Sequence, residues 1–169
     1  MIENDVKLRA LEPEDLDFLY KIENDSALWG VGNTNVPYSR YVLHDYIAHA
    51  KNDIYADQQV RLVVENGVGK TIGVADITNF DARNLRAEVG IVILREYRQQ
   101  GYALKALQQI SHYALNILHL HQLYGVADTA NTASMELFRK AGYSHTGLLK
   151  DRLFDGKTYH DAMLMQLFL

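Results

Sequence analysis

An apolar strand that leads through a short loop into a long helix constrains the fold of this chain more than any other feature. Residues Ala87–Leu94 are almost all apolar, which is typical of a strand buried on both faces. After a loop that ends in Gly101, the pattern of Tyr102–Leu118 predicts the longest helix of the chain. The free N–H groups at such a helix start favour binding of a pyrophosphate, to which Arg98 could add a charged contact.

The rest of the chain predicts a mixed α/β fold in a single domain over residues 1–169. Only two prolines occur, and no linker, repeat or low-complexity segment is present. Asp155-Gly156 between two alternating runs predicts a terminal hairpin. The predicted strands are Val6–Leu11, Gln59–Glu65, Thr71–Asn79, Ala87–Leu94, Gln122–Ala127, Ser144–Phe154 and Lys157–Leu167, and the predicted helices are Pro13–Glu23, 40–51, Tyr102–Leu118 and Thr132–Ala141.

Composition excludes several classes of function. The chain has no cysteine, which excludes disulfides, cysteine-ligated zinc and thiol chemistry. Its formal net charge of −4 is unlike the basic surface of a nucleic-acid binder, so we expect no nucleic-acid partner. No apolar run approaches the ~20 residues that span a bilayer. Because Met1–Asp5 also lacks the features of a signal peptide, we expect a cytoplasmic protein without membrane contact.

Two other interpretations of these patterns are weaker. Gly101 and Ala103 could serve only to turn the chain and to pack the helix. A dinucleotide site, as in an oxidoreductase, requires three spaced glycines, of which only one is present here.

His119 and His121 form the one close histidine pair, and no third ligand lies at suitable spacing, so we expect no metal.

Two motifs in order resemble those of the GNAT N-acetyltransferase superfamily. Arg98-x-x-Gly101-x-Ala103 after a buried strand is similar to its acetyl-CoA signature, and Asn131–Tyr143 is similar to its later Asn-x-x-Ala/Ser-x-x-Leu-Tyr/Phe-x-x-x-Gly-Phe/Tyr segment. Lys7–Glu12 resembles the opening of the branch that contains spermidine and ribosomal-protein N-terminal acetyltransferases. The resemblance covers nearly the whole chain.

This resemblance implies a fold and a cofactor. The fold would be a twisted, mostly antiparallel sheet of about seven strands, splayed at the cofactor cleft and flanked by about four helices. The implied co-substrate is acetyl-CoA, with no metal. Its pantetheine would pair with the backbone of Ile91, Val92 and Ile93, its pyrophosphate would lie against Arg98, Gln99, Gln100, Gly101, Tyr102 and Ala103, and Asn131, Ser134 and Phe138 would complete the cofactor site.

The implied enzyme is an acyltransferase in which a primary amine directly attacks the thioester. The amine could belong to a polyamine, another small molecule or a protein N-terminus. Because an alkyl amine is mostly protonated at neutral pH, a base is needed, and Glu88 stands at the family's usual acidic position. A carboxylate at a strand end could equally be only solvated. Homodimers are common in this branch, so a dimer is possible.

The sequence departs from the family pattern at two places. Many relatives have a tyrosine seven residues after the asparagine, near the thioester sulfur, whereas this chain has Phe138, which lacks a hydroxyl. Ser134 and Tyr143 are weak substitutes, and a CoA-binding sensor without turnover is the alternative function. The loop Trp29–Ser39 contains no acid, which counts against a regulatory polyamine site and, less strongly, against polyamines as substrates. Its aromatic residues, with Tyr41, could line an acceptor cleft or simply pack.

Overall fold

The computed structural model describes residues 5–29, 36–51 and 53–169 and is built on one seven-stranded sheet. The strand order is β1-β2-β3-β4-β5-β7-β6, and every neighbouring pair is antiparallel except β4 and β5. The resemblance predicted this sheet, and the prediction is confirmed. The strands are β1 (Val6–Ala10), β2 (Val60–Asn66), β3 (Thr71–Asp81), β4 (Arg86–Ile93), β5 (Gln122–Asp128), β6 (Ser144–Phe154) and β7 (Tyr159–Phe168).

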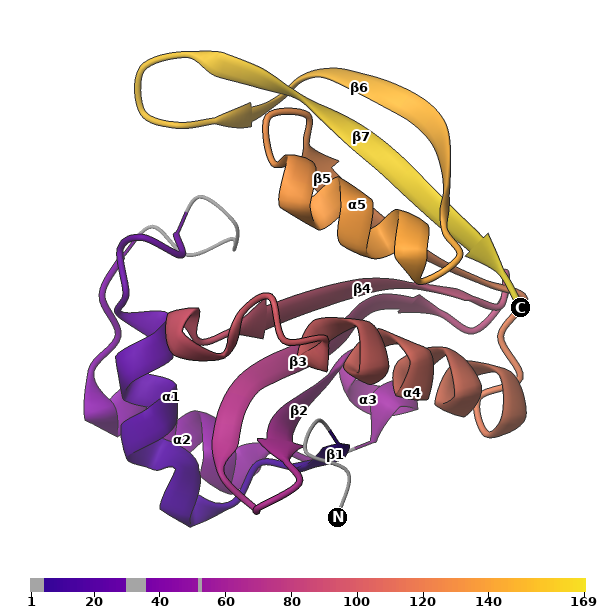
Figure 1. The fold of residues 1–169 in the computed structure, drawn as a ribbon. Coiled ribbons are helices and arrows are strands. Elements are labelled where there is room, and N and C mark those ends of the chain that lie inside the picture. The colour runs from indigo at the N-terminus through magenta and orange to yellow at the C-terminus, as the bar shows by residue number, and fades with distance from the viewer. Residues whose placement is uncertain (1–4, 30–35, 52) are drawn as a thin grey trace.

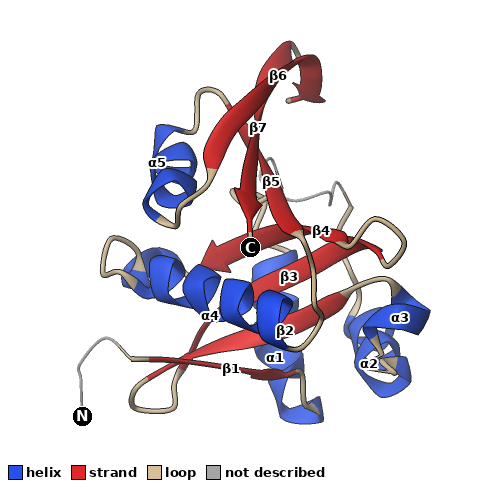
Figure 2. Ribbon diagram, turned by 90° about the vertical axis from the view of Figure 1, so that its right-hand side faces the viewer, coloured by secondary structure: helices blue, strands red, loops and turns tan. Residues whose placement is uncertain are grey.

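Helices cover both faces of the sheet (Figures 1 and 2). Helices α1 and α2 lie on one face, and α4 lies across the other, with α5 beside β5. Short 3-10 turns, η1 (Pro13–Asp15) and η2 (Arg95–Tyr97), precede α1 and the loop before α4. The α-helices are α1 (Leu16–Glu23), α2 (Arg40–His49), α3 (Ile54–Asp57), α4 (Tyr102–Asn116) and α5 (Thr132–Lys140).

The prediction of about four helices missed α3. This helix is a single turn whose start is capped by the Asp53 carboxylate, which accepts from the backbone N–H of Tyr55 and Ala56. One turn is too short to show a helical period in the sequence. The predicted extent of α4 was two residues too long, because the helix ends at Asn116 and His119 adopts a left-handed φ of 53°.

Each face of the sheet carries its own apolar core. The larger core packs α4 and α5 on β3, β4 and β5, with Leu107, Ile110 and Leu123 fully buried. The smaller core packs Leu19 of α1 and Leu43 of α2 on Val63 and Val74. β4 alternates between the two environments rather than being buried on both faces as predicted. Its residues on the α1 side, Glu88 and Val92 among them, are only half-buried.

The most consequential feature of the sheet is the short contact between its two parallel strands. β4 and β5 pair only through Arg86–Gln122, Ala87–Leu123 and Glu88–Tyr124. Beyond Glu88 the two strands separate, as Figure 1 shows. The opposite edge of β4 continues to pair with β3 as far as Ile93. In the described part of the chain, no strand pairs after Glu88 with the edge of β4 that faces β5. The backbone groups on that edge are therefore available to a ligand.

Candidate active site

The junction of β4 with α4 has the geometry of an anion site. Arg98 Nε donates to the backbone oxygen of Ile93 at 2.9 Å, which folds the loop back on the end of β4. Gly101, the N-cap of α4, has a φ of +86°, which glycine adopts without the strain that a side chain would cause. A Cβ on Gly101 would meet open space, and the first turn of α4 contains no acidic residue. These features fit a pyrophosphate at the helix start.

The predicted cofactor residues fall into exposed and buried groups. The backbone of Ile91–Ile93 follows the last pair with β5, and the loop residues Gln99 and Gln100 are exposed. In contrast, Tyr102 is buried and packs edge-on against Tyr97, with ring centroids 6.4 Å apart. Ala103 is half-buried against the larger core. We therefore expect the tyrosine and the alanine to act through their backbone N–H groups.

Helix α5 starts directly after the end of β5, on the other side of the strand separation. Asn131 is its N-cap, because the Asn131 side-chain oxygen accepts from the backbone N–H of Ser134 at 3.0 Å. This confirms the predicted cap. That oxygen is occupied within the chain, so a contact of Asn131 with a ligand would fall to its amide nitrogen.

Phe138 is a core residue. Its side chain is 4% exposed, and its ring lies edge-on to Tyr143, with centroids 5.0 Å apart. The ring also fills the space above β5, since a Cβ on Gly125 would come within 2.4 Å of it. Tyr143 is buried behind Phe138, and burial raises the pKa of the Tyr143 phenol well above its ordinary value. Tyr143 therefore does not replace the proton donor that many relatives have at the position of Phe138.

Glu88 lies where β4 and β5 part, on the face of the sheet that carries α1 and α2. Its side chain is half-buried and accepts a 2.8 Å hydrogen bond from the Asn79 amide of β3. Across the parallel pair stands Tyr124. Burial and the charge of Glu88 raise the pKa of Tyr124 above its ordinary value. The sequence predicted Glu88 but gave no sign of its two partners.

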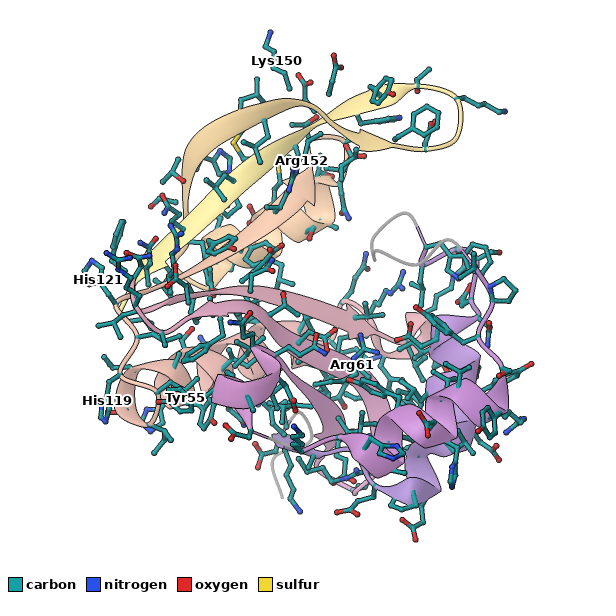
Figure 3. The ribbon with its side chains drawn as sticks, turned by 180° about the vertical axis from the view of Figure 1, so that it is seen from behind. Tyr55, Arg61, His119, His121, Lys150 and Arg152 are labelled. Carbon is teal, nitrogen blue, oxygen red and sulfur yellow. The ribbon has the colours of Figure 1, made fainter. Side chains whose placement is uncertain are left out.

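A charged network occupies the same face of the sheet. Arg61 of β2 pairs with Asp76 of β3, with Nε–Oδ1 and Nη2–Oδ2 distances of 2.7 and 3.0 Å, and also bonds Glu23 at the end of α1. Burial disfavours the guanidinium charge, but the two carboxylates offset that penalty and raise the pKa of Arg61. Figure 3 shows Arg61 amid this face. Two carboxylates against one cation leave the network negative, and sequence reasoning missed it.

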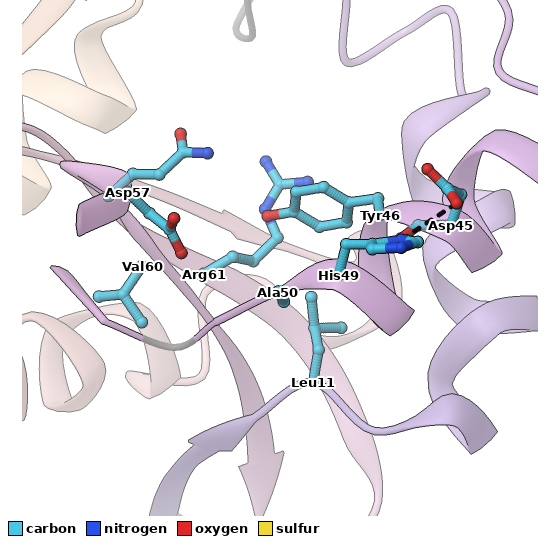
Figure 4. Close-up of a pocket in the computed structure, with 9 residues that line it drawn as sticks. Leu11, Asp45, Tyr46, His49, Ala50, Asp57, Val60 and Arg61 are labelled. Carbon is cyan, nitrogen blue, oxygen red and sulfur yellow. Dashed lines mark hydrogen bonds and ion pairs between the residues drawn. The ribbon is translucent and has the colours of Figure 1, made fainter.

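A hollow of about 250 Å³ lies beside this network, between α2, α3 and β2. Figure 4 shows Tyr46 beside Arg61 and the ion pair of His49 with Asp45 among the residues that line it. Asp57 also lines it, so the hollow has a mixed, partly acidic wall. It opens two strands away from the separation of β4 and β5, and it is distinct from the predicted cofactor site.

The aromatic residues predicted near the acceptor loop are divided between packing and exposure. The Trp29 indole donates to the backbone oxygen of Glu23, and both backbone groups of Tyr38 bond Asn24. Tyr41 is exposed. These contacts favour packing for Trp29 and Tyr38. Most of the loop without acids, residues 30–35, lies outside the described residues.

The histidines of the described residues do not gather into a metal site. No group of three or more histidine, aspartate or glutamate side chains in residues 5–29, 36–51 and 53–169 is arranged to hold an ion. His119 and His121 lie at the end of the molecule opposite α1 and α2 (Figure 3). The prediction that the enzyme needs no metal stays a prediction.

Comparison with known proteins identifies the class to which this fold and junction belong. Residues 5–144 match the model of the acetyltransferase (GNAT) domain family. The chain therefore belongs to the GNAT acetyltransferases, as its two motifs indicated.

Several relatives share nearly the whole chain. The spermidine N(1)-acetyltransferase of Escherichia coli (strain K12) is 30% identical over 167 residues, which cover 96% of this chain and 86% of the relative. The putative ribosomal N-acetyltransferase YdaF of Bacillus subtilis (strain 168) is 27% identical over 96% of this chain and 90% of the relative. A crystal structure of spermidine N-acetyltransferase from Vibrio cholerae, in complex with CoA and spermine, matches with a TM-score of 0.84 and 26% identity over 96% of this chain and 95% of that one.

Proposed function

We propose that this acetyltransferase transfers the acetyl group of acetyl-CoA to a primary amine of a polyamine. The observation that carries the proposal is the separation of β4 from β5 after Glu88, with the start of α4, whose first turn has no acidic residue, at the far end of the open strand. This arrangement offers one end of the split to the cofactor phosphates. It leaves the other end, where the carboxylate lies, to the acetyl group and the amine.

The proposed reaction is direct attack in a ternary complex. Glu88, through a water molecule, takes a proton from the bound ammonium, and the free amine nitrogen then forms a bond to the thioester carbonyl carbon. A backbone N–H on the open edge of β4 stabilises the negative oxygen. The carbon–sulfur bond breaks, CoA leaves as the thiolate, and the surplus proton of the attacking nitrogen passes to that sulfur or to water, which leaves a neutral amide. Because a thiol has a pKa near ~8.5, this departure needs no strong acid, which is consistent with Phe138 in the core.

Charge on the acceptor face supports a polyamine over a neutral amine. Glu88 and the negative network of Glu23, Arg61 and Asp76 share the face that carries α1 and α2. Asp128, at the end of β5, lies on the same face as Glu88 by strand alternation. A chain of ammonium groups gains from several carboxylates when it loses water. The names of the relatives from Escherichia coli and Vibrio cholerae point to the same class of acceptor.

Thiol release from acetyl-CoA tests the proposal, and the lack of cysteine removes any background from the protein itself. Spermidine, spermine, monoamines and short peptides with free N-termini are compared as acceptors. We expect turnover with polyamines and its loss in Glu88→Gln. Turnover with peptides alone would assign a protein N-terminal acetyltransferase. CoA binding without turnover on any amine would overturn the enzyme assignment in favour of a sensor.

Location and assembly remain proposals. No helix in the described residues is long and apolar enough to cross a membrane. We propose a cytoplasmic protein that forms a homo-oligomer, with a dimer as the smallest unit. One structure of the Vibrio cholerae relative is described as dodecameric, so size-exclusion chromatography with light scattering should allow for assemblies larger than the predicted dimer.

A further inference from the structure

An irregularity in β3 brings Asn79 to Glu88. The antiparallel register of β3 with β4 shifts between Thr78 and Asp81, which is a bulge. Within it, Asn79 has a φ of +48°, a left-handed conformation that asparagine tolerates better than most residues. In a regular strand, consecutive side chains point to opposite faces, so residue 79 would point away from the face of residue 78.

The bulge reverses that alternation. Thr78 is the register partner of Glu88 and shares its face, and the extra residue lets Asn79 reach the same carboxylate, whose Oε2 accepts from Asn79 Nδ2 at 2.8 Å. Phe80 is thereby turned into the larger core. Bulges are commonly placed where a strand must re-aim a side chain. Here the re-aimed side chain is a hydrogen-bond donor to the predicted base.

A second group constrains Glu88 from the opposite strand. Tyr124 is its partner in the last parallel pair before β4 and β5 separate. Burial raises the pKa of this phenol most, the negative charge of Glu88 raises it further, and the charge of Arg86 lowers it. Because the phenol stays protonated at neutral pH, it can donate to the carboxylate. Glu88 therefore has a hydrogen-bonded donor on β3 and a phenol opposite it on β5.

We propose that Asn79 and Tyr124 are positioning residues that together fix the Glu88 carboxylate at the point where β4 and β5 separate. This inference rests on the proposed function, since it assigns Glu88 the role of base. A carboxylate on a free rotamer would spend much of its time away from the amine, whereas two donors from two rigid strands restrict it to one orientation.

Substitutions at position 79 separate positioning from mere structural support. Asn79→Gly keeps the left-handed backbone and removes the donor, and Asn79→Asp keeps the size but replaces the donor with a second carboxylate. We expect kcat to fall by about tenfold in Asn79→Gly and in Tyr124→Phe, and further in Asn79→Asp, with the KM for acetyl-CoA unchanged. Asn84→Gly in the adjacent turn is the matched control. An Asn79→Asp variant as active as Asn79→Gly would overturn the inference.

A measurement without turnover keeps this inference separate from the proposed function. Ring-labelled tyrosine NMR, with the Tyr124 signal assigned by its loss in Tyr124→Phe, follows ionisation of this phenol. We expect Tyr124 to titrate above the ordinary tyrosine range in the wild-type protein and at lower pH in Glu88→Gln. An unchanged titration in Glu88→Gln would show that the two groups do not meet, whatever the activity. Wild-type protein with this response but no turnover on any amine would instead overturn the proposed function.

Discussion

Among the described residues, Asp15 is the one charged residue that is buried, with 6% of its surface exposed. Its carboxylate accepts from Arg9 Nη1 and Nη2 at 2.6 and 2.8 Å and from the backbone N–H of Glu12 at 2.9 Å. It therefore joins β1 to the start of the first helical turn. The hydrogen bonds from Arg9 are the main reason that its pKa is lowered, and burial opposes them.

Asp15→Asn is expected to lower the free energy of unfolding by about 2 kcal/mol at neutral pH, because Arg9 loses a partner in a buried place. A lowered pKa in the folded state means that the carboxylate stabilises the fold fully above its unfolded pKa of about 3.9, and that this stabilisation is lost as the pH falls through the folded value. Urea unfolding at several pH values measures both effects.

Asp17→Asn is the matched control, since Asp17 also pairs with an arginine, Arg40, but its side chain is 83% exposed. Exposed pairs contribute little to stability. Equal losses in the two variants would contradict the argument from burial. A difference in free energy of unfolding between the wild-type protein and Asp15→Asn that did not become smaller at acid pH would also contradict that argument.

At the scale of elements, we expect the start of α4 to bind the cofactor phosphates. Gly101 and Gly156 provide a direct comparison, because their φ values are +86° and +95° and a Cβ meets open space at both. Alanine at either position adds similar backbone strain, on the order of 1 kcal/mol. Of the two glycines, only Gly101 belongs to the proposed phosphate loop.

We therefore expect Gly101→Ala to weaken CoA binding by about tenfold, as measured by isothermal titration calorimetry, and Gly156→Ala to leave it unchanged. Both variants should lose comparable stability in thermal unfolding, which shows that any loss of affinity does not arise from general destabilisation. Equal CoA affinities in the two variants would argue against a phosphate site at α4.

For the whole molecule, the three residue pairs between β4 and β5 are the weak point of the sheet. A ligand that binds the open edge of β4 would link the two parts and stabilise only the folded state. At CoA concentrations of about 100 times Kd, the free energy of unfolding should rise by ~2.7 kcal/mol, which corresponds to roughly 5 to 10 °C in Tm.

Thermal unfolding with CoA and with NAD at equal concentrations measures this effect. We expect a shift with CoA alone, together with slower hydrogen exchange at the backbone of Gly90–Ile93. A shift with NAD instead would support the dinucleotide alternative that the single glycine of the loop argued against. A shift with CoA without protection of β4 would place the ligand elsewhere on the molecule.

The sequence by itself determined the features that depend on neighbouring residues. These include the succession of strands and longer helices along the chain, the Asp155-Gly156 hairpin, the Asn131 cap and the loop before α4. Each depends on local conformational preference or on the period of apolar residues, and both can be seen in a short segment. The two motifs in order then indicated the family, and the comparisons showed it.

Only the tertiary structure decided which side chains meet. The contact of Asn79 with Glu88 depends on a bulge in the register of β3 with β4, and the pair of Glu88 with Tyr124 depends on where two strands distant in sequence separate. The place of Phe138 in the core depends on the lack of a side chain at Gly125. Strand register is fixed by packing across the whole sheet, so no local signal in the sequence could reveal these contacts.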